Sequence, residues 1–237
     1  MGAMNWERWA RGAGAGFVVL TVAAFIVGGD APRVGDSTDD LISYYDGDRG
    51  KVLVSGLLFA FGLALLLWFA AAIANMLRES GEGRAAATAI AGATAFVTLQ
   101  LVLTGIGASL AYSIAGAGDE GVVKALFDLQ WLLDMFAALP VALFVLASSV
   151  GFMRTRAVPS WLSWAGIVVA ALFLLRATTW AKDGFWSPTG EYLFILIPAA
   201  TLWVLVTSIT LVRRAPSSSE AEGRPLAAAS ATTDVAS

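Results

Sequence analysis

Six long apolar runs, each ended by charged residues, constrain the fold of this chain more than any other feature. A transmembrane helix needs about 20 mostly apolar residues to cross roughly 30 Å of hydrocarbon. The runs cover approximately 12–29, 52–77, 85–115, 129–153, 160–181 and 192–212. Hydrophobic residues make up 58% of the chain and charged residues 14%, which lies well outside soluble composition. The sequence therefore predicts an all-α membrane protein, a bundle of six transmembrane helices.

Basic residues in the short loops predict which side of the membrane each loop faces. Eight lie beside the membrane on the side that holds the N-terminus: Arg8, Arg11, Arg78, Arg84, Arg154, Arg156, Arg213 and Arg214. The other side holds five basic and eleven acidic residues, for a net charge of −6. We therefore expect residues 1–214 to form the transmembrane domain, with both termini in the cytoplasm.

Two stretches near the termini need separate interpretation. The residues that follow Arg214 are mainly Ala, Ser, Pro, Thr and Glu, which cannot bury a core, so we expect a disordered cytoplasmic tail over 215–237.

The first apolar run could be a signal peptide and not a membrane helix, because it is short and follows Arg8 and Arg11. Its flank, residues 28–32, lacks a clear small-x-small cleavage site, which favours a membrane helix.

The first outer loop carries a helix signal of its own. Ser37 is followed three residues later by Asp40, which is the spacing of a capping box with Asp in place of Glu. Leu41, Tyr44 and Tyr45 would then share one face of a short helix. We expect this short interfacial helix to lie on the outer membrane surface, either as an ordinary connector or as a lid over an outward cavity.

The chain contains no histidine and no cysteine. This excludes disulfides, thiolate chemistry, imidazole catalysis, and haem or zinc sites ligated by these residues. A net charge of −3 argues against a nucleic-acid partner. No phosphate-binding loop and no acidic repeat with metal-ligand spacing occurs in the apolar runs, so the sequence predicts no metal and no cofactor.

Two ionisable residues lie within the apolar runs, where charges are costly and normally face a partner or a wet cavity. Asp134 lies six residues after Asp128 on a descending helix, about 9 Å deeper at 1.5 Å per residue, and Arg176 lies seven before Asp183 on the next, ascending helix, about 10 Å deeper. Because a short loop joins these helices, they should be antiparallel neighbours. The equal depths predict an ion pair between Asp134 and Arg176.

Other polar and aromatic residues converge on the same level. Gln130 lies one helical turn above Asp134, and Thr179 and Trp180 lie about one turn above Arg176. Gln100 and Thr104 place an amide and a hydroxyl in the middle of the third run, where interhelical hydrogen bonding is the favoured role. The pair can be interpreted as a structural fixture of helix register, or these side chains can line an outward-facing polar pocket that binds a ligand.

One segment resembles a known family. Val158-Pro159-Ser160-Trp161-Leu162-Ser163, after a helix that ends Gly151-Phe152-Met153-Arg154, is similar to a segment of an uncharacterised family of bacterial six-helix integral membrane proteins that bears a domain-of-unknown-function label. The resemblance extends loosely over the last three helices. Twelve arginines against three lysines agree with a high-GC bacterial source. The resemblance implies a six-helix bundle in the bacterial cytoplasmic (inner) membrane and transfers no catalytic residue.

Three functional interpretations follow. The first is a non-enzymatic multi-pass protein that binds a lipid or small amphiphile from the outer leaflet, or serves as a partner subunit or oligomer. The second is a small transporter in which Asp134 exchanges a proton or binds a cationic substrate with Arg176 beside it. The third is a membrane enzyme that acts on a lipid or isoprenoid through carboxylates, which a neighbouring arginine opposes because it favours the charged form of Asp134.

Overall fold

The structure is a computed structural model that describes residues 3–181 and 184–214, so the predicted tail at 215–237 lies outside the described residues. All regular elements within these residues are helical. The long helices are α1 (Ala3–Gly28), α3 (Arg49–Glu79), α4 (Gly83–Ser109), α5 (Glu120–Thr155), α6 (Ser160–Arg176) and α7 (Leu193–Arg213). The short elements are α2 (Thr38–Ile42), the π-helical turns η1 (Ser43–Gly47) and η2 (Leu110–Ile114), and the 3-10 turn η3 (Ala115–Ala117).

The helices are those of a multi-pass membrane protein. By length and composition, α1, α3, α5, α7 and the continuous segment from α4 through η3 can each cross a membrane. The sixth apolar helix, α6, has 17 residues and is shorter than these five. Large hydrophobic side chains such as Ile26, Phe61 and Phe194 are exposed on the outside of the bundle, as expected of a surface that faces lipid.

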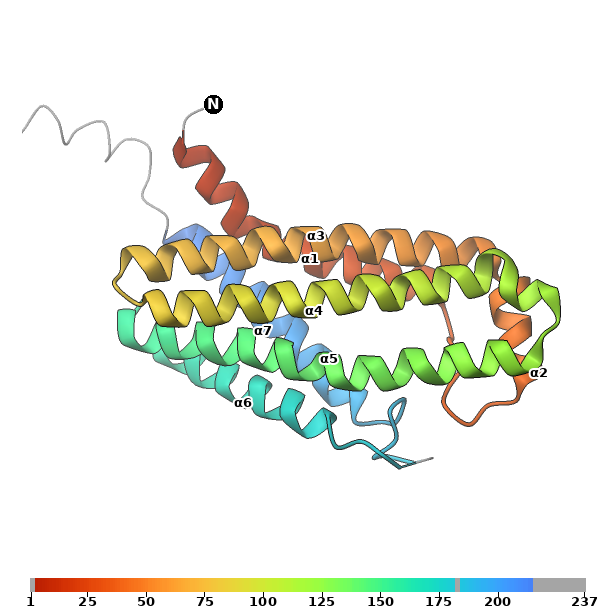
Figure 1. The fold of residues 1–237 in the computed structure, drawn as a ribbon. Helices are drawn as coiled ribbons and strands as arrows, with labels where there is room; N and C mark the ends of the chain where they lie inside the picture. The colour runs from red at the N-terminus through yellow and green to blue at the C-terminus, as the bar shows by residue number, and fades with distance from the viewer. Residues whose placement is uncertain (1–2, 182–183, 215–237) are drawn as a thin grey trace, which may run out of the picture.

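The long helices form a ring in which each packs against two neighbours. Going around, the order is α1, α3, α4, α5, α6 and α7, and α7 returns to α1 (Figure 1). Figure 1 also shows that the first turns of α1, the end of α7 and the α3–α4 and α5–α6 connections lie at one end of the bundle, which we call the termini end. The opposite end, which carries α2, is called the α2 end.

Three of the expected helix boundaries are wrong. The helix expected at 12–29 is α1, which already begins at Ala3. The run expected at 129–153 is part of a longer helix, α5, which begins at Glu120 because the Asp119 carboxylate caps it by accepting from the Val122 amide at 3.1 Å. The helix expected at 160–181 ends at Arg176. There the amide and hydroxyl of Thr179 both donate to the Arg176 carbonyl, at 3.0 and 2.8 Å, so local bonds replace the next helical turn.

The short helix expected in the first loop is present. Ser37 accepts a hydrogen bond from the Asp40 amide at 3.2 Å and caps α2, as the capping-box spacing predicts. Its apolar face does not lie on the membrane surface, because Leu41 and Tyr45 are almost fully buried and pack against the bundle around Phe127. Burial also raises the pKa of Tyr45, so this phenol stays neutral at ordinary pH.

A serine of α7 joins α7 to α1 near the termini end. The Ser208 hydroxyl donates to the Arg11 carbonyl at 2.6 Å and accepts from the Ala15 amide at 3.1 Å. These two backbone groups are four residues apart and would otherwise bond each other within the helix. A side chain inserted in this way bends a helix, and Figure 1 shows α1 bending near its N-terminal end.

Helices α4 and α5 approach closely at Gly92. A Cβ atom added there would lie 2.6 Å from the Pro140 carbonyl oxygen and 2.7 Å from the Phe144 amide nitrogen, both backbone atoms of α5. Backbone atoms in a packed helix pair cannot rotate away as a side chain can. The α4–α5 contact at this level therefore requires a residue without a side chain.

We expect Gly92→Ala to lower the free energy of unfolding by roughly 1–3 kcal/mol, because the methyl group overpacks the α4–α5 contact. Gly105→Ala is the matched control, since a Cβ at Gly105 in the same helix meets nothing within 4 Å. The control should be neutral or slightly stabilising, as alanine favours helix. Thermal unfolding in detergent compares the variants, and equal effects at the two positions would contradict the close packing.

Candidate functional site

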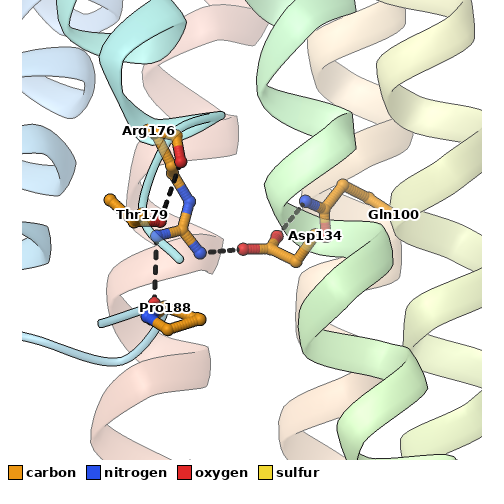
Figure 2. A network of polar contacts seen from close by, with 5 residues as sticks. All are labelled: Gln100, Asp134, Arg176, Thr179 and Pro188. Carbon is orange, nitrogen blue, oxygen red and sulfur yellow. Dashed lines mark hydrogen bonds and ion pairs between the residues drawn. The ribbon is translucent and has the colours of Figure 1, made fainter. Parts of the chain in front are cut away.

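The predicted ion pair between Asp134 and Arg176 is confirmed. Arg176, the last residue of α6, donates through Nη2 to the Asp134 Oδ2 atom on α5 (Figure 2). The pair joins two neighbouring antiparallel helices, as the counting of residues from the membrane surface predicts. Its position differs in one respect, because Arg176 ends its helix instead of lying inside it.

The two partners are buried to different degrees. The Arg176 side chain is 4% exposed and the Asp134 side chain 24% exposed. The second terminal nitrogen of Arg176, Nη1, donates to the Pro188 carbonyl at 3.0 Å, which ties the irregular segment after α6 to the guanidinium (Figure 2). The arginine is thus enclosed by protein, whereas the carboxylate faces the interior space of the ring.

Gln100 binds the second oxygen of the Asp134 carboxylate, the one that Arg176 does not bind. Its Nε2 donates to Asp134 Oδ1 at 2.8 Å, so the predicted interhelical hydrogen bond of Gln100 is confirmed and links α4 to α5. The same expectation for Thr104 is wrong, because its hydroxyl donates to the Gln100 carbonyl of its own helix at 2.8 Å. Both oxygens of Asp134 therefore have a partner, one charged and one neutral.

Thr179 and Trp180 do not lie one turn above Arg176, because the helix stops before them. Thr179 is fully buried and bonds the Arg176 carbonyl, so it supports the arginine through the backbone. Trp180 is 58% exposed and packs edge-on against Phe136, with ring centroids 6.0 Å apart. Trp180 therefore lies outside the polar cluster that the sequence predicted it would join.

The segment between α6 and α7 is held by several further hydrogen bonds. The Tyr192 hydroxyl donates to the Leu172 carbonyl of α6 at 2.6 Å, and the Thr189 hydroxyl accepts from the Val34 amide of the first loop at 3.1 Å. These hydrogen bonds fix the segment beside Arg176.

A cavity of about 350 Å³ opens beside the ion pair, inside the ring. Its wall is mostly apolar and includes residues of all six long helices. The polar residues on the wall are Thr21, Gln100, Gln130, Asp134, Arg176 and Thr201. A mainly apolar cavity of this size with a few convergent polar groups has the character of a site for a small molecule.

A second cavity of about 220 Å³ adjoins the first toward the α2 end. The two share seven lining residues: Thr21, Phe25, Phe59, Gln100, Leu103, Gln130 and Trp131. The far wall of the second cavity is formed by Pro32, Tyr44 and Tyr45, so the first loop and η1 lie over it. This position suits both roles that the sequence predicts for the segment, a connector and a lid over the cavity.

The cavities are closed toward the termini end. Phe144, on the wall of the first cavity, packs edge-on against Trp203 with centroids 6.4 Å apart. Trp203 donates through Nε1 to the Leu162 carbonyl at 3.1 Å and so joins α7 to α6. Beyond it lie the fully buried side chains of Phe69 and Phe152. The second cavity therefore continues the interior space toward the α2 end.

Gln130 and Thr21 stand out on the shared wall. The Gln130 Oε1 and Thr21 Oγ1 atoms are buried and have no hydrogen-bond partner among the described residues. Such a group costs on the order of 1–3 kcal/mol when its partner is missing. The sequence singled out Gln130 but missed Thr21, because a lone threonine in a helix usually bonds its own backbone and gives no signal.

In chemical terms the site suits noncovalent binding. Its one carboxylate is paired with an arginine, and among the described residues no three acidic side chains gather as a metal site would require.

Comparisons with protein-family models, with curated proteins and with solved structures find no match for this chain. The resemblance to the bacterial six-helix family therefore stays an expectation.

We expect Asp134→Asn and Arg176→Gln each to lower the free energy of unfolding by about 3–5 kcal/mol, because each leaves a buried charge uncompensated. The double variant Asp134→Leu/Arg176→Met should recover much of this loss. Asp128→Asn is the control, since the Lys124–Asp128 pair on the same helix is exposed and should contribute less than about 1 kcal/mol. Thermal unfolding measures all four, and additive losses in the double variant would contradict the pairing.

Proposed function

We propose that this protein is a non-enzymatic membrane protein that binds a small amphiphile in the cavity beside Asp134 and Arg176. This proposal rests on one observation: the cavity wall is mainly apolar but includes the Asp134 carboxylate, which is paired with Arg176 and partly exposed. The apolar wall suits a hydrocarbon chain, and the polar cluster suits a headgroup that forms hydrogen bonds. Because the cavities extend toward the α2 end, the ligand would come from the leaflet or the solution on that side.

We further propose that the α2 end faces outward and that all six long helices cross the membrane, with both termini in the cytoplasm. The excess of basic residues at the termini end supports this orientation. The bundle places both described ends of the chain on one side, which agrees with an even number of crossings. The bacterial cytoplasmic membrane is the proposed location, on the resemblance described above.

A transporter is the second candidate. The observation that favours it is the one-sided space, which extends toward the α2 end beneath the first loop and is bounded by Trp203 and Phe144 toward the termini end. Such a shape corresponds to one state of an alternating-access cycle. A transporter would move a substrate across a sealed vesicle, whereas a binding protein would only retain it, so uptake into proteoliposomes separates the two functions. A partner-subunit role would leave the cavity empty of any amphiphile.

Filling the cavity tests the binding proposal. We expect Ala200→Phe to weaken binding of 1-lauroylglycerol at least about tenfold, because its ring occupies space that the lauroyl chain needs, a loss of about 1.4 kcal/mol. Leu202→Phe is the control, since Leu202 faces outward and is 60% exposed. Native mass spectrometry gives both affinities. Undiminished binding by the Ala200 variant, at an unchanged melting temperature, would place the ligand elsewhere.

Single cysteines test the orientation, because the native chain has no thiol. In intact cells, an impermeant maleimide should label Ser37→Cys, before α2, and should leave Ser80→Cys, between α3 and α4, unlabelled until the membrane is opened. A cysteine at Ser217 should behave like the one at Ser80. Labelling of position 80 or 217 in intact cells would reverse the proposed topology.

A further inference from the structure

The place where the two cavities meet carries polar groups that the fold itself does not use. Thr21 on α1 is 6% exposed, and both it and Gln130 on α5 line both cavities. The Thr21 Oγ1 and Gln130 Oε1 atoms have no partner in the part of the chain that the structure describes. Two uncompensated oxygens on one cavity wall point to a hydrogen-bonding group that the cavity receives.

The free hydroxyl of Thr21 departs from the pattern of this bundle. Most hydroxyl residues with a partner in the long helices donate to the carbonyl four residues earlier: Thr88, Thr104, Ser109, Ser148, Ser149, Thr155, Thr201 and Thr210. Ser163 and Thr207 also lack a partner among the described residues, but neither lines either cavity. Thr21 is thus a buried hydroxyl that lines both cavities and has no partner among the described residues.

The charge of the site restricts the headgroup. Asp134 and Arg176 neutralise each other, and both carboxylate oxygens are already bonded, by Arg176 and by Gln100. A cationic or anionic headgroup buried here would find no unpaired counter-charge and would keep its desolvation cost. An uncharged headgroup with hydroxyls can donate to Gln130 Oε1 and exchange a hydrogen bond with Thr21 at a smaller cost.

The apolar wall shows where a chain would lie. The hydrogen bonds between α1 and α7 fall at Arg11 and Ala15, near the termini end. Farther along, α1 contributes Phe17 and Phe25 to the first cavity, and α7 contributes Leu196 among other residues to the same cavity. The two helices thus line one apolar space that begins at Thr21 and Gln130 and can take a single hydrocarbon chain.

We propose that Thr21 and Gln130 form a polar subsite for the uncharged, hydroxylated headgroup of a single-chain amphiphile, such as a monoacylglycerol or a fatty alcohol, whose chain lies between α1 and α7. This inference rests on the proposed binding function and narrows its ligand class. It adds a residue of α1 to the site and separates headgroup recognition from the ion pair.

The test compares three probes that share one chain: 1-lauroylglycerol, dodecylammonium and laurate. Native mass spectrometry of the full-length protein in glyco-diosgenin gives their affinities. We expect the lauroylglycerol to bind most tightly, and Thr21→Val and Gln130→Leu each to weaken its binding about fivefold to tenfold through the loss of one hydrogen bond. Thr21→Ser keeps the hydroxyl and should retain the affinity.

Thr207→Val is the matched control, because it also removes an unpartnered hydroxyl from a helix but lies outside both cavities. It should bind lauroylglycerol as the wild-type protein does. Equal binding of the three probes, or full affinity in the folded Thr21→Val and Gln130→Leu variants, would overturn the subsite and leave the proposed function standing. Failure of the wild-type protein to bind any of the probes would instead overturn both.

Discussion

The guanidinium of Arg176 joins the end of α6 to the rest of the bundle. Buried backbone polar groups need hydrogen-bond partners, so an irregular segment in the bundle needs protein groups that bond it. Helix α6 stops after 17 residues, about 25 Å of rise, and an irregular segment follows. Arg176 donates to the Pro188 carbonyl of that segment and to Asp134 on α5, and Thr179 satisfies the carbonyl at the helix end. One buried side chain thereby holds three parts of the structure together.

The position of the cavity follows from this arrangement and from the close packing at the other end. Toward the termini end, Gly92, Ser208 and Trp203 bring neighbouring helices of the ring together. Toward the α2 end, the short α6 leaves Arg176 and its segment to complete the wall. The Asp134–Arg176 pair, which joins α5 to the end of α6, therefore also places the Asp134 carboxylate on the wall of the apolar cavity.

The sequence predicts the helical membrane fold and the ion pair because both depend on simple periodic geometry. Apolar runs with charged ends mark the helices, and counting residues from the membrane surface brings Asp134 and Arg176 to one depth. The end of α6 could not be predicted in this way, because Thr179 replaces the next turn with local bonds in a stretch whose composition still suits a helix. The outward position of Trp180 follows from that early end.

Other parts of the site have no distinctive sequence signal. The Pro188 carbonyl is a backbone atom that any residue would supply, and only the tertiary structure places it beside Arg176. Thr21 resembles every other threonine in an apolar helix until its neighbours are known. The sequence identifies Gln130 because it lies one helical turn from Asp134, an ionisable residue whose cost at membrane depth draws attention to that level.

The most direct test of the account is an experimental structure of the protein purified in nanodiscs of its native lipids. We predict that Arg176 bonds both Asp134 and Pro188, and that an elongated non-protein density lies between α1 and α7 with its polar end at Thr21 and Gln130. A structure in which the helices close on each other and side chains fill the space beside an intact Asp134–Arg176 pair would contradict it.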